Sequence, residues 1–498
     1  MAKVVIVGAG IGGLAAGALL ARRGVAVTIL DRAAEPGGKM REVMVGGARI
    51  DSGPTVLTMR WVFDEIFAAA GGSFEAAVRL TPASVLARHA WSQGGSLDLF
   101  ADKERSADAI GRLSGHAEAD GYRRFCAASE RIYKTLEGPF LKTARPTIGS
   151  LIREGAGNPL DLWNIRPFAV LWQELGRYFK DERLRQLFAR YATYCGSSPF
   201  LAPATLMLIA HVEQQGVWLV DGGMQRLCQT MAGLCTAQGG VVRHGAQVEK
   251  LLVAGGKVAG VALAGGEQIH ADAVIYNGDT GALAAGLLGP EAARTVAGPA
   301  PGRRSLSAVT WSMLAEASGF PLARHTVFFS DDYTTEFNEL FSARKVPSRP
   351  TVYICAQDRS SDGARTGTGP ERLFCLINAP ATGHRGRLSS DEVSRCQTIL
   401  TTQLAHCGLT IAAKPELTVM TEPADFARMF PGSGGALYGQ ATHGWKASFE
   451  RPGARTKLPG LYLAGGGVHP GAGLPMVALS GRHAASCLMA DLGSRATS

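Results

Sequence analysis

The chain opens on the stretch Val4-Val5-Ile6-Val7-Gly8-Ala9-Gly10-Ile11-Gly12-Gly13-Leu14, which is answered further along by Ile29-Leu30-Asp31. An apolar strand that enters a Gly-x-Gly-x-x-Gly turn and continues into a helix is the pattern of a dinucleotide-binding βαβ unit. Gly8 permits the tight bend, Gly10 lets the backbone approach a pyrophosphate, and Gly13 lets the helix pack closely on the sheet. Asp31 lies where a carboxylate accepts hydrogen bonds from a ribose diol. The opening residues therefore predict a nucleotide cofactor at the N-terminus of the first helix, where free N–H groups face phosphate.

Composition describes a large, apolar, globular protein. The 498 residues predict roughly two or three domains. Hydrophobic residues make up 46% and charged residues 19%, with a mean hydropathy of +0.06, so an apolar substrate is a reasonable expectation. The formal charge of +9 is scattered without a dense basic tract, which argues against nucleic acid as a partner.

The cysteines and the first residues of the chain indicate the cellular compartment in which the protein is expected. The nine cysteines include no Cys-x-x-Cys and no spacing typical of metal ligands, so we expect reduced, mostly buried thiols and no metal site. The first strand begins by Lys3, which leaves no room for a leader peptide, so the protein is expected in the cytoplasm. The apolar stretch from Phe200 to Val220 is interrupted by His211 and Glu213 among others and falls short of a spanning helix. Any membrane contact is expected to be peripheral.

Further glycine-dense segments follow the opening motif. They are Arg32-Ala33-Ala34-Glu35-Pro36-Gly37-Gly38-Lys39-Met40-Arg41, Asp51-Ser52-Gly53-Pro54-Thr55 and, near the end, Leu461-Tyr462-Leu463-Ala464-Gly465-Gly466-Gly467. Helical patterns dominate from about 60 to 215, and strands separated by glycine turns return from about 240 to 277. The segment from about 285 to 440 mixes strands and helices like a second domain. One nucleotide-binding fold assembled from three separated pieces is therefore expected.

One helix within this region has two readings. Leu184, Leu187, Phe188 and Tyr191 repeat at helical spacing, with arginines and lysines between them. The pattern is typical of a core-facing helix with a solvated face, and it also fits a basic amphipathic helix lying on a membrane.

The motifs together resemble the phytoene-desaturase-type carotenoid desaturases, which are FAD enzymes. The resemblance is carried by the opening glycines, Pro36-Gly37-Gly38-Lys39, Asp51 to Thr55, and His469-Pro470-Gly471-Ala472-Gly473-Leu474-Pro475. More narrowly, Gly53 to Arg60, Leu437-Tyr438-Gly439 and His443 to Pro452 look like the branch that acts on 1-hydroxy and 1-methoxy carotenoids, the hydroxyneurosporene (methoxyneurosporene) desaturases. That branch introduces the 3,4 double bond of an acyclic carotenoid.

The resemblance implies an α/β protein with a Rossmann-type FAD-binding fold of the amine-oxidase and carotenoid-desaturase kind. Its FAD-binding domain is expected from residues 1–75, 216–285 and 441–498. Residues 286–440 are expected to form an α+β substrate domain, and residues 76–215 a helical region that contacts substrate and membrane. The segment from Phe200 to Trp218 is the preferred membrane contact.

The resemblance also implies the FAD-binding residues. They are Gly8, Gly10, Gly13, Asp31, Arg32, Gly38, Lys39, Arg41, Gly53, Pro54, Thr55, Val248, Asn277, Gly465, Gly466, Leu474 and Met476. Lys39 stands where arginine often follows the paired glycines, which keeps the charge and loses a bidentate fork.

Desaturation needs few catalytic side chains, because hydride transfer to FAD is chemistry that the cofactor supplies. His443 and His469 are candidate proton acceptors, since imidazole titrates near working pH, while the alternative role for each is a hydrogen-bonding loop anchor. Glu213 is expected as an exposed acid on an amphipathic helix. Trp218, Tyr353 and Trp445 either line a polyene tunnel or belong to ordinary core packing.

The expected partners are an acyclic carotenoid, the surface of the inner or photosynthetic membrane, and an electron acceptor that is either quinone or oxygen. Rival functions within the same family are phytoene desaturase and carotene isomerase. More distant rivals are an amine-oxidase-like or protoporphyrinogen-oxidase-like enzyme, a nicotinamide dehydrogenase, and a non-catalytic lipid-binding relative such as a GDP-dissociation inhibitor.

Overall fold

A computed structural model describes residues 1–147, 149, 165–166 and 168–496. The opening motif forms the centre of a parallel five-stranded sheet with the order β10-β2-β1-β14-β21. Its strands come from three separate parts of the chain: β1 (Lys3–Val7), β2 (Ala26–Leu30), β10 (Val241–Arg243), β14 (Ala273–Tyr276) and β21 (Leu461–Leu463). The predicted assembly of one nucleotide-binding fold from three segments is confirmed.

Helices cover one face of this sheet and a small meander covers the other. The helices are α1 (Ile11–Arg22), α2 (Arg60–Ala69), α11 (Gln225–Ala237) and α17 (Leu474–Ala496). Helix α1 packs tightly on α17, because a Cβ at Gly481 would lie 2.0 Å from the Gly12 carbonyl oxygen. On the opposite face, β11 (Val248–Ala254), β12 (Lys257–Leu263) and β13 (Gln268–His270) share a core with Val5, Val274 and Leu463. The nucleotide-binding layer therefore has a dry interior on both sides.

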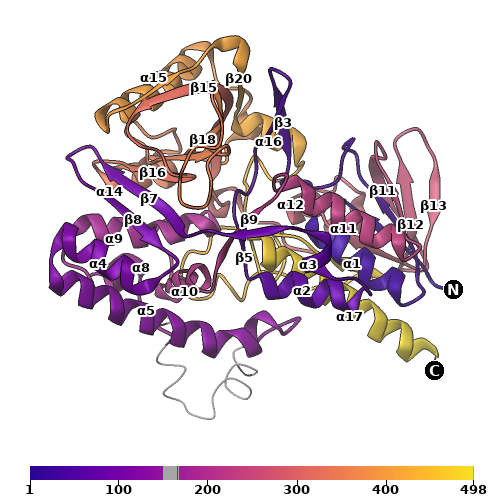
Figure 1. The fold of residues 1–498 in the computed structure, drawn as a ribbon. Coiled ribbons are helices and arrows are strands. Elements are labelled where there is room, and N and C mark those ends of the chain that lie inside the picture. Colours follow the sequence, from indigo (N-terminus) through magenta and orange to yellow (C-terminus); the bar gives the residue numbers. More distant parts are fainter. Residues whose placement is uncertain (148, 150–164, 167, 497–498) are drawn as a thin grey trace.

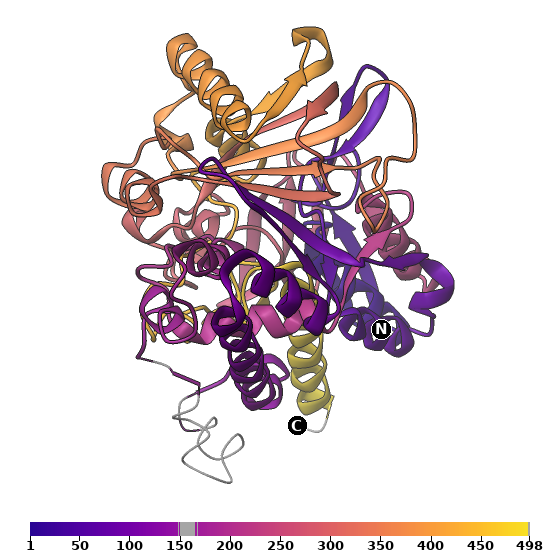
Figure 2. The ribbon, with the colours of Figure 1, turned by 60° about the vertical axis from the view of Figure 1, so that its left-hand side comes forward.

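A second, mostly antiparallel sheet forms the opposite end of the molecule (Figure 1). Its order is β19-β15-β18-β17-β16-β7-β8, and β20 also pairs with β15. The strands are β7 (Val85–Trp91), β8 (Ser96–Phe100), β15 (Ser307–Gly319), β16 (His325–Phe329), β17 (Val352–Ala356), β18 (Glu371–Ala379), β19 (Leu409–Ala412) and β20 (Thr418–Thr421). Helix α15 (Ser390–His406) lies over it, as both views show (Figures 1 and 2).

The hairpin of β7 and β8 corrects the expectation of a helical region beginning near residue 60. Strand β7 pairs in parallel with β16, so this part of the chain completes the large sheet. Only the turn has a local signal, because Gly94 and Gly95 between the two strands both have positive φ, as hairpin turns prefer. The strand conformation of β7 also depends on pairing with β16, which lies more than two hundred residues further along the chain.

Helices do dominate between the hairpin and residue 214. They are α4 (Lys103–Ser114), α5 (His116–Leu136), α8 (Leu171–Leu175), α9 (Glu182–Ala189) and α10 (Leu208–Gln214), with the π-helical turn η1 (Glu137–Leu141) and the 3-10 turns η2 (Arg190–Cys195) and η3 (Ala204–Met207). Leu184, Leu187, Phe188 and Tyr191 are all buried in one aromatic-rich core with α5. The core-facing interpretation of this helix is confirmed.

Shorter elements connect these layers. They are β3 (Glu42–Val45), β4 (Ala48–Asp51), β5 (Leu57–Thr58), α3 (Phe74–Ala77), β6 (Leu80–Pro82), β9 (Val217–Val220), α12 (Thr280–Ala284), α13 (Pro290–Ala293), η4 (Pro301–Arg303), α14 (Tyr333–Asn338), η5 (Glu339–Ala343), η6 (Gly383–Arg385), η7 (Pro415–Leu417) and α16 (Pro423–Met429).

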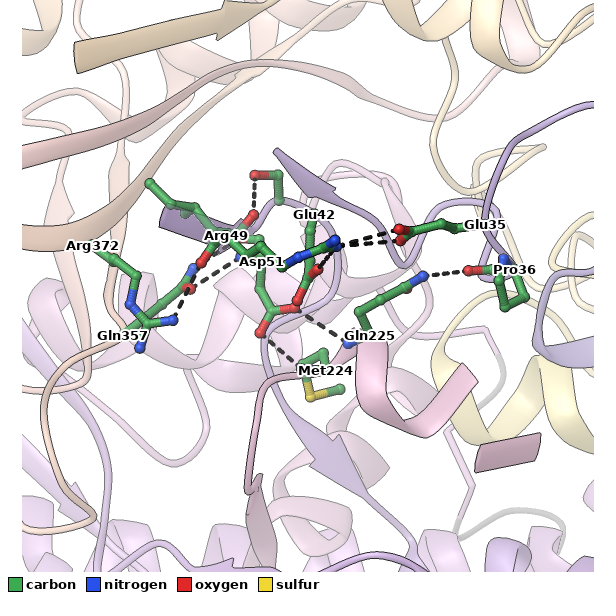
Figure 3. A network of polar contacts seen from close by, with 11 residues as sticks. Glu35, Pro36, Glu42, Arg49, Asp51, Met224, Gln225, Gln357 and Arg372 are labelled. Carbon is green, nitrogen blue, oxygen red and sulfur yellow. Dashed lines mark hydrogen bonds and ion pairs between the residues drawn. The ribbon is translucent and has the colours of Figure 1, made fainter. Parts of the chain in front are cut away.

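Asp51 joins three of the layers (Figure 3). Its carboxylate accepts hydrogen bonds from the backbone N–H groups of Met224 (2.8 Å) and Gln225 (3.3 Å), at the start of α11. Its backbone exchanges two hydrogen bonds with the Gln357 side chain, beside β17 of the large sheet. The Gln225 side chain in turn donates to the Pro36 carbonyl oxygen. The sheets therefore meet through a polar joint next to the Ser52-to-Thr55 loop.

The described part of the chain holds no helix that is both long enough and apolar enough to cross a bilayer.

Candidate functional site

One cavity of about 1460 Å³ extends from the carboxyl ends of the parallel strands into the space between the large sheet and the helices. Its lining includes every residue predicted to bind FAD except Gly13. Residues from all three segments of the nucleotide-binding fold therefore face the same space. The carboxyl ends of parallel strands are where such folds bind their ligands.

The first glycine turn is shaped for phosphate. Gly8 has a φ of +105°, and a Cβ at Gly13 would lie 2.1 Å from the Gly8 carbonyl oxygen. Gly13 thus serves helix packing behind the cavity wall, as its place in the motif predicts. Helix α1 has no side-chain cap at Gly10, so its first N–H groups are not used by a capping side chain.

Asn277, which follows β14, closes the turn from the side. Its amide nitrogen donates to the carbonyl oxygens of Gly8 (3.1 Å) and Gly10 (3.4 Å). Its Oδ1 is buried without a hydrogen-bond partner among the described residues. A side chain that orders the phosphate turn and still holds an unused acceptor fits a site built for a ligand.

Asp31 is fixed at the end of β2. Its Oδ2 accepts a hydrogen bond from the Ala9 N–H (2.7 Å), and its Oδ1 accepts one from the Ala33 N–H (2.8 Å). Each carboxylate oxygen has a second lone pair, so the group can still accept from a ribose hydroxyl in the cavity.

Lys39 was expected to lie along the pyrophosphate, and in the structure its ammonium group also contacts a loop on the far side of the cavity. Lys39 Nζ donates to the Leu437 carbonyl oxygen (2.7 Å) and lies over the Phe430 ring, 5.3 Å from its centroid. Burial lowers the pKa of Lys39, and Asp279 acts in the opposite direction. Arg41 Nη2 similarly donates to Thr421 Oγ1 (3.0 Å). Both cations line the cavity and also hold the loops on its far side.

The C-terminal glycine loop is supported by a residue that sequence reasoning passed over. Arg451 is buried and donates to the carbonyl oxygens of Gly466 (2.9 Å) and Gln440 (2.9 Å). The Gly465 N–H donates to Ser480 Oγ (2.8 Å). Arg451 lies inside one of the motifs that carried the resemblance, so its presence was visible although its role was not. It fixes the backbone that faces the cavity beside Leu474 and Met476.

The two candidate histidines lie outside the cavity lining. His443 Nε2 accepts a hydrogen bond from the Ser198 N–H (2.9 Å). His469 Nε2 lies 2.9 Å from the Phe140 carbonyl oxygen and 3.0 Å from that of Thr143, so it donates to these acceptors. Burial lowers the pKa of each imidazole to about 4. These contacts favour the loop-anchor alternative, and a role in proton transfer stays a prediction.

The other half of the cavity is mostly apolar. Its wall includes Leu99, Leu136, Leu187, Leu206, Leu208, Ile209, Val212, Val327, Leu376 and Phe449. Tyr353 and Trp445 also line it, whereas Trp218 does not belong to the lining and stacks with Arg60. Leu206 is buried and Leu208 half-buried on this wall. Leu206 and Leu208 therefore face the cavity, and the prediction that the segment from Phe200 to Trp218 contacts a membrane is wrong for these two residues.

Glu213 is a second correction, because it is buried and not an exposed acid. Its oxygens accept hydrogen bonds from the hydroxyl groups of Tyr191 (2.8 Å) and Tyr194 (2.8 Å). Burial raises the pKa of Glu213, and the two tyrosine hydrogen bonds oppose that rise. Glu213, Tyr191 and Tyr194 all line the cavity. Because the two tyrosines precede Glu213 by 22 and 19 positions, the sequence gives no signal for such a cluster.

Comparison with known proteins identifies the family. The family model described as flavin containing amine oxidoreductase matches residues 11–489. The chain belongs to this family. It is 53% identical to the hydroxyneurosporene desaturase of Rubrivivax gelatinosus, over 100% of this chain and 95% of the relative, and 45% identical to that of Cereibacter sphaeroides, over 99% and 98%. A solved oxidoreductase from Methanosarcina mazei aligns with a TM-score of 0.61 at 17% identity, over 98% of this chain and 99% of the other.

Membership of this family indicates which ligand the cavity binds. This flavin oxidoreductase carries FAD as its cofactor, and the predictions of an FAD-dependent enzyme and of a resemblance to carotenoid desaturases are confirmed. The uncapped start of α1, the free Oδ1 of Asn277 and the unused lone pairs of Asp31 are the features of this chain that fit a dinucleotide.

Proposed function

We propose that this flavin oxidoreductase introduces a 3,4 double bond into acyclic 1-hydroxy or 1-methoxy carotenoids. One observation carries the proposal: a single cavity holds the nucleotide loops at one end and a long apolar wall at the other. At about 1460 Å³ it exceeds the roughly 300–1,000 Å³ typical of pockets for one small molecule, as a cofactor and a polyene together require. The relatives named hydroxyneurosporene desaturase supply the substrate class.

In this proposal the protein binds, orients and keeps water away. Bound FAD supplies the two-electron oxidation of the C3–C4 bond. Leu187, Ile209 and Val212 hold the polyene by apolar contact, and Tyr353 with Thr55 positions its end beside the flavin loops. The apolar wall excludes water from a reaction that removes hydride and a proton.

We also propose that the enzyme collects its substrate at a membrane surface, through an apolar patch made of the exposed Phe168 and Leu201 and the half-buried Trp445. Phe168 is 70% exposed and Leu201 is 50% exposed. The Phe168 ring packs edge-on against Trp445 with centroids 5.3 Å apart, and the Gly444 N–H donates to the Leu201 carbonyl oxygen. Trp445 also lines the cavity, so the patch adjoins the substrate space. The formal charge of +9 favours an anionic surface.

Purified holoenzyme supplied with 1-hydroxyneurosporene, neurosporene or phytoene in liposomes tests the substrate class. We expect loss of two hydrogens from the hydroxylated carotenoid, seen as a shift in absorption and a fall in mass. Turnover of phytoene in preference to 1-hydroxyneurosporene would replace the proposal by a phytoene desaturase. A product of unchanged mass formed with reduced flavin would replace it by an isomerase. Parallel assays with oxygen excluded and a quinone added identify the electron acceptor.

A further inference from the structure

A charged side chain interrupts the apolar half of the cavity. Arg190 begins η2, directly after α9, and lines the cavity among Leu187, Leu206 and Ile209. Its guanidinium lies over two tyrosine rings, 5.4 Å from the centroid of Tyr353 and 6.0 Å from that of Tyr194. Arg190 is half-buried, and a cation beside apolar side chains requires an explanation, because such surroundings disfavour a charge that lacks hydrogen-bond acceptors.

The arginine lies close to the flavin-binding loops. The Tyr353 hydroxyl is 2.6 Å from Oγ1 of Thr55, and Thr55 belongs to the Gly53-to-Thr55 loop that faces the cofactor end of the cavity. One tyrosine ring therefore separates Arg190 from that loop. The Arg190 charge also acts on the ionisation of Tyr438, whose carbonyl oxygen accepts from the same Arg451 nitrogen as that of Gly466 in the C-terminal loop.

The polar groups around Arg190 bond mainly to one another, and the Arg190 charge opposes the burial-induced rise in the pKa of Glu213 and of Tyr194. The two oxygens of Glu213 accept from Tyr191 and Tyr194, and the Tyr353 hydroxyl is shared with Thr55 and with Nδ1 of His325 (2.8 Å). Within residues 1–147, 149, 165–166 and 168–496, Arg190 forms no ion pair with a carboxylate. A guanidinium carries five N–H donors, so several remain for whatever occupies the cavity.

We propose that Arg190 binds the oxygen atom on C1 of the carotenoid and thereby selects oxygenated over hydrocarbon ends. This inference rests on the proposed function and names the side chain that sets its substrate preference. A guanidinium only donates hydrogen bonds, so it recognises a hydroxyl and a methoxyl oxygen alike, whereas a carboxylate would accept only from the hydroxyl. The oxygen on C1 is separated from C3 by C1 and C2 alone. The group that binds it must therefore lie beside the flavin loops, as Arg190 does.

The test compares 1-hydroxyneurosporene with 1,2-dihydroneurosporene, which lacks only the oxygen, in the wild-type holoenzyme and in Arg190→Met. We expect wild-type kcat/KM to favour the hydroxylated substrate. In Arg190→Met, kcat/KM for that substrate should fall by about 10- to 100-fold, the loss expected for a hydrogen bond from a charged group, while the dihydro hydrocarbon is converted as before. Arg190→Lys should recover part of the preference.

Arg185→Met is the matched control. Arg185 lies on the preceding helix and stacks on Trp172, 4.5 Å from the ring centroid, and it is not part of the cavity lining. Bound flavin, read from its absorbance, confirms that each variant is folded. Equal losses on both substrates in Arg190→Met, or no preference in the wild type, would overturn the oxygen-binding role and leave the desaturase standing. If no carotenoid is desaturated by the wild type, the proposed function itself fails.

Discussion

Asp51 is predicted to hold the nucleotide-binding layer and the large sheet together, and Asp51→Ala tests this directly. The carboxylate is 8% exposed and accepts the N–H groups of Met224 and Gln225. Its removal leaves two buried donors without an acceptor, each worth about 1–3 kcal/mol. Part of this loss is offset, because burial of the carboxylate is itself unfavourable, as its raised pKa indicates. We expect a net destabilisation of about 2–4 kcal/mol.

The neighbouring Arg49 provides the control (Figure 3). Arg49 pairs with Glu42 at 2.9 Å, but its side chain is 54% exposed, so Arg49→Ala should cost about 0–1 kcal/mol. The assay is urea unfolding of the holoprotein, together with the temperature at which flavin fluorescence is released. Asp51→Ala should release flavin at a clearly lower temperature, because the Ser52-to-Thr55 loop follows directly. Equal stabilities of the two variants would refute the reasoning.

The same site has a pH dependence of known sign. Because burial raises the pKa of Asp51 above its ordinary value of 3.8, the folded protein binds this proton more readily than the unfolded chain does. The contribution of this carboxyl to stability therefore falls as pH rises through that range. Asp51→Asn should gain on the wild type as pH increases from about 4. A constant difference between the two proteins would contradict this.

Three further predictions concern the loops and the surface. Gly13→Ala should abolish flavin retention, because its Cβ would lie 2.1 Å from the Gly8 carbonyl oxygen, whereas Gly233→Ala on α11, which meets nothing within 4 Å, should be neutral or stabilising. Burial lowers the pKa of His469 to about 4, so the unfolded chain binds this proton more readily than the folded protein does. The free energy of unfolding should therefore fall by about 2 kcal/mol between pH 7 and pH 5 because of this group. In urea titrations His469→Gln should lose this pH dependence, and an unchanged dependence would contradict the prediction. Phe168→Ser combined with Leu201→Ser should weaken sedimentation with anionic liposomes about 10- to 100-fold, while Val241→Ser, 51% exposed on the edge strand β10, should not; full retention by the double variant would reject the patch.

The nucleotide-binding fold was predictable because its signals are local. A strand, a glycine turn and a helix follow one another within the first residues, and the steric need for glycine is met inside the motif itself. Gly13 cannot carry a side chain because of Gly8, five positions before it. The same holds for the strands after residue 240, each marked by glycine turns.

The hairpin at β7 and β8 was missed because its partner is distant. Its strands are held by β16, whose residues follow more than two hundred positions later. Lys39 illustrates the same limit at a single side chain. The sequence places a cation beside paired glycines, but its hydrogen bond runs to Leu437, 398 positions away. Only the assembled fold shows that this lysine also fastens a loop.

The histidines and Glu213 show why catalytic assignments were harder than cofactor assignments. An imidazole acts as base, acid or anchor according to the atoms that face it, and those atoms are Ser198 N for His443 and Phe140 O for His469, 245 and 329 positions away. Glu213 follows an apolar run and was expected in solvent, yet Tyr191 and Tyr194 hold it inside the cavity. Among the described residues this carboxylate forms no ion pair with Arg190, although the Arg190 charge opposes the rise in the pKa of Glu213. Donors of Arg190 therefore remain for the substrate, and the polarity of this cavity depends on which neighbouring groups bond to one another, a property that no short motif encodes.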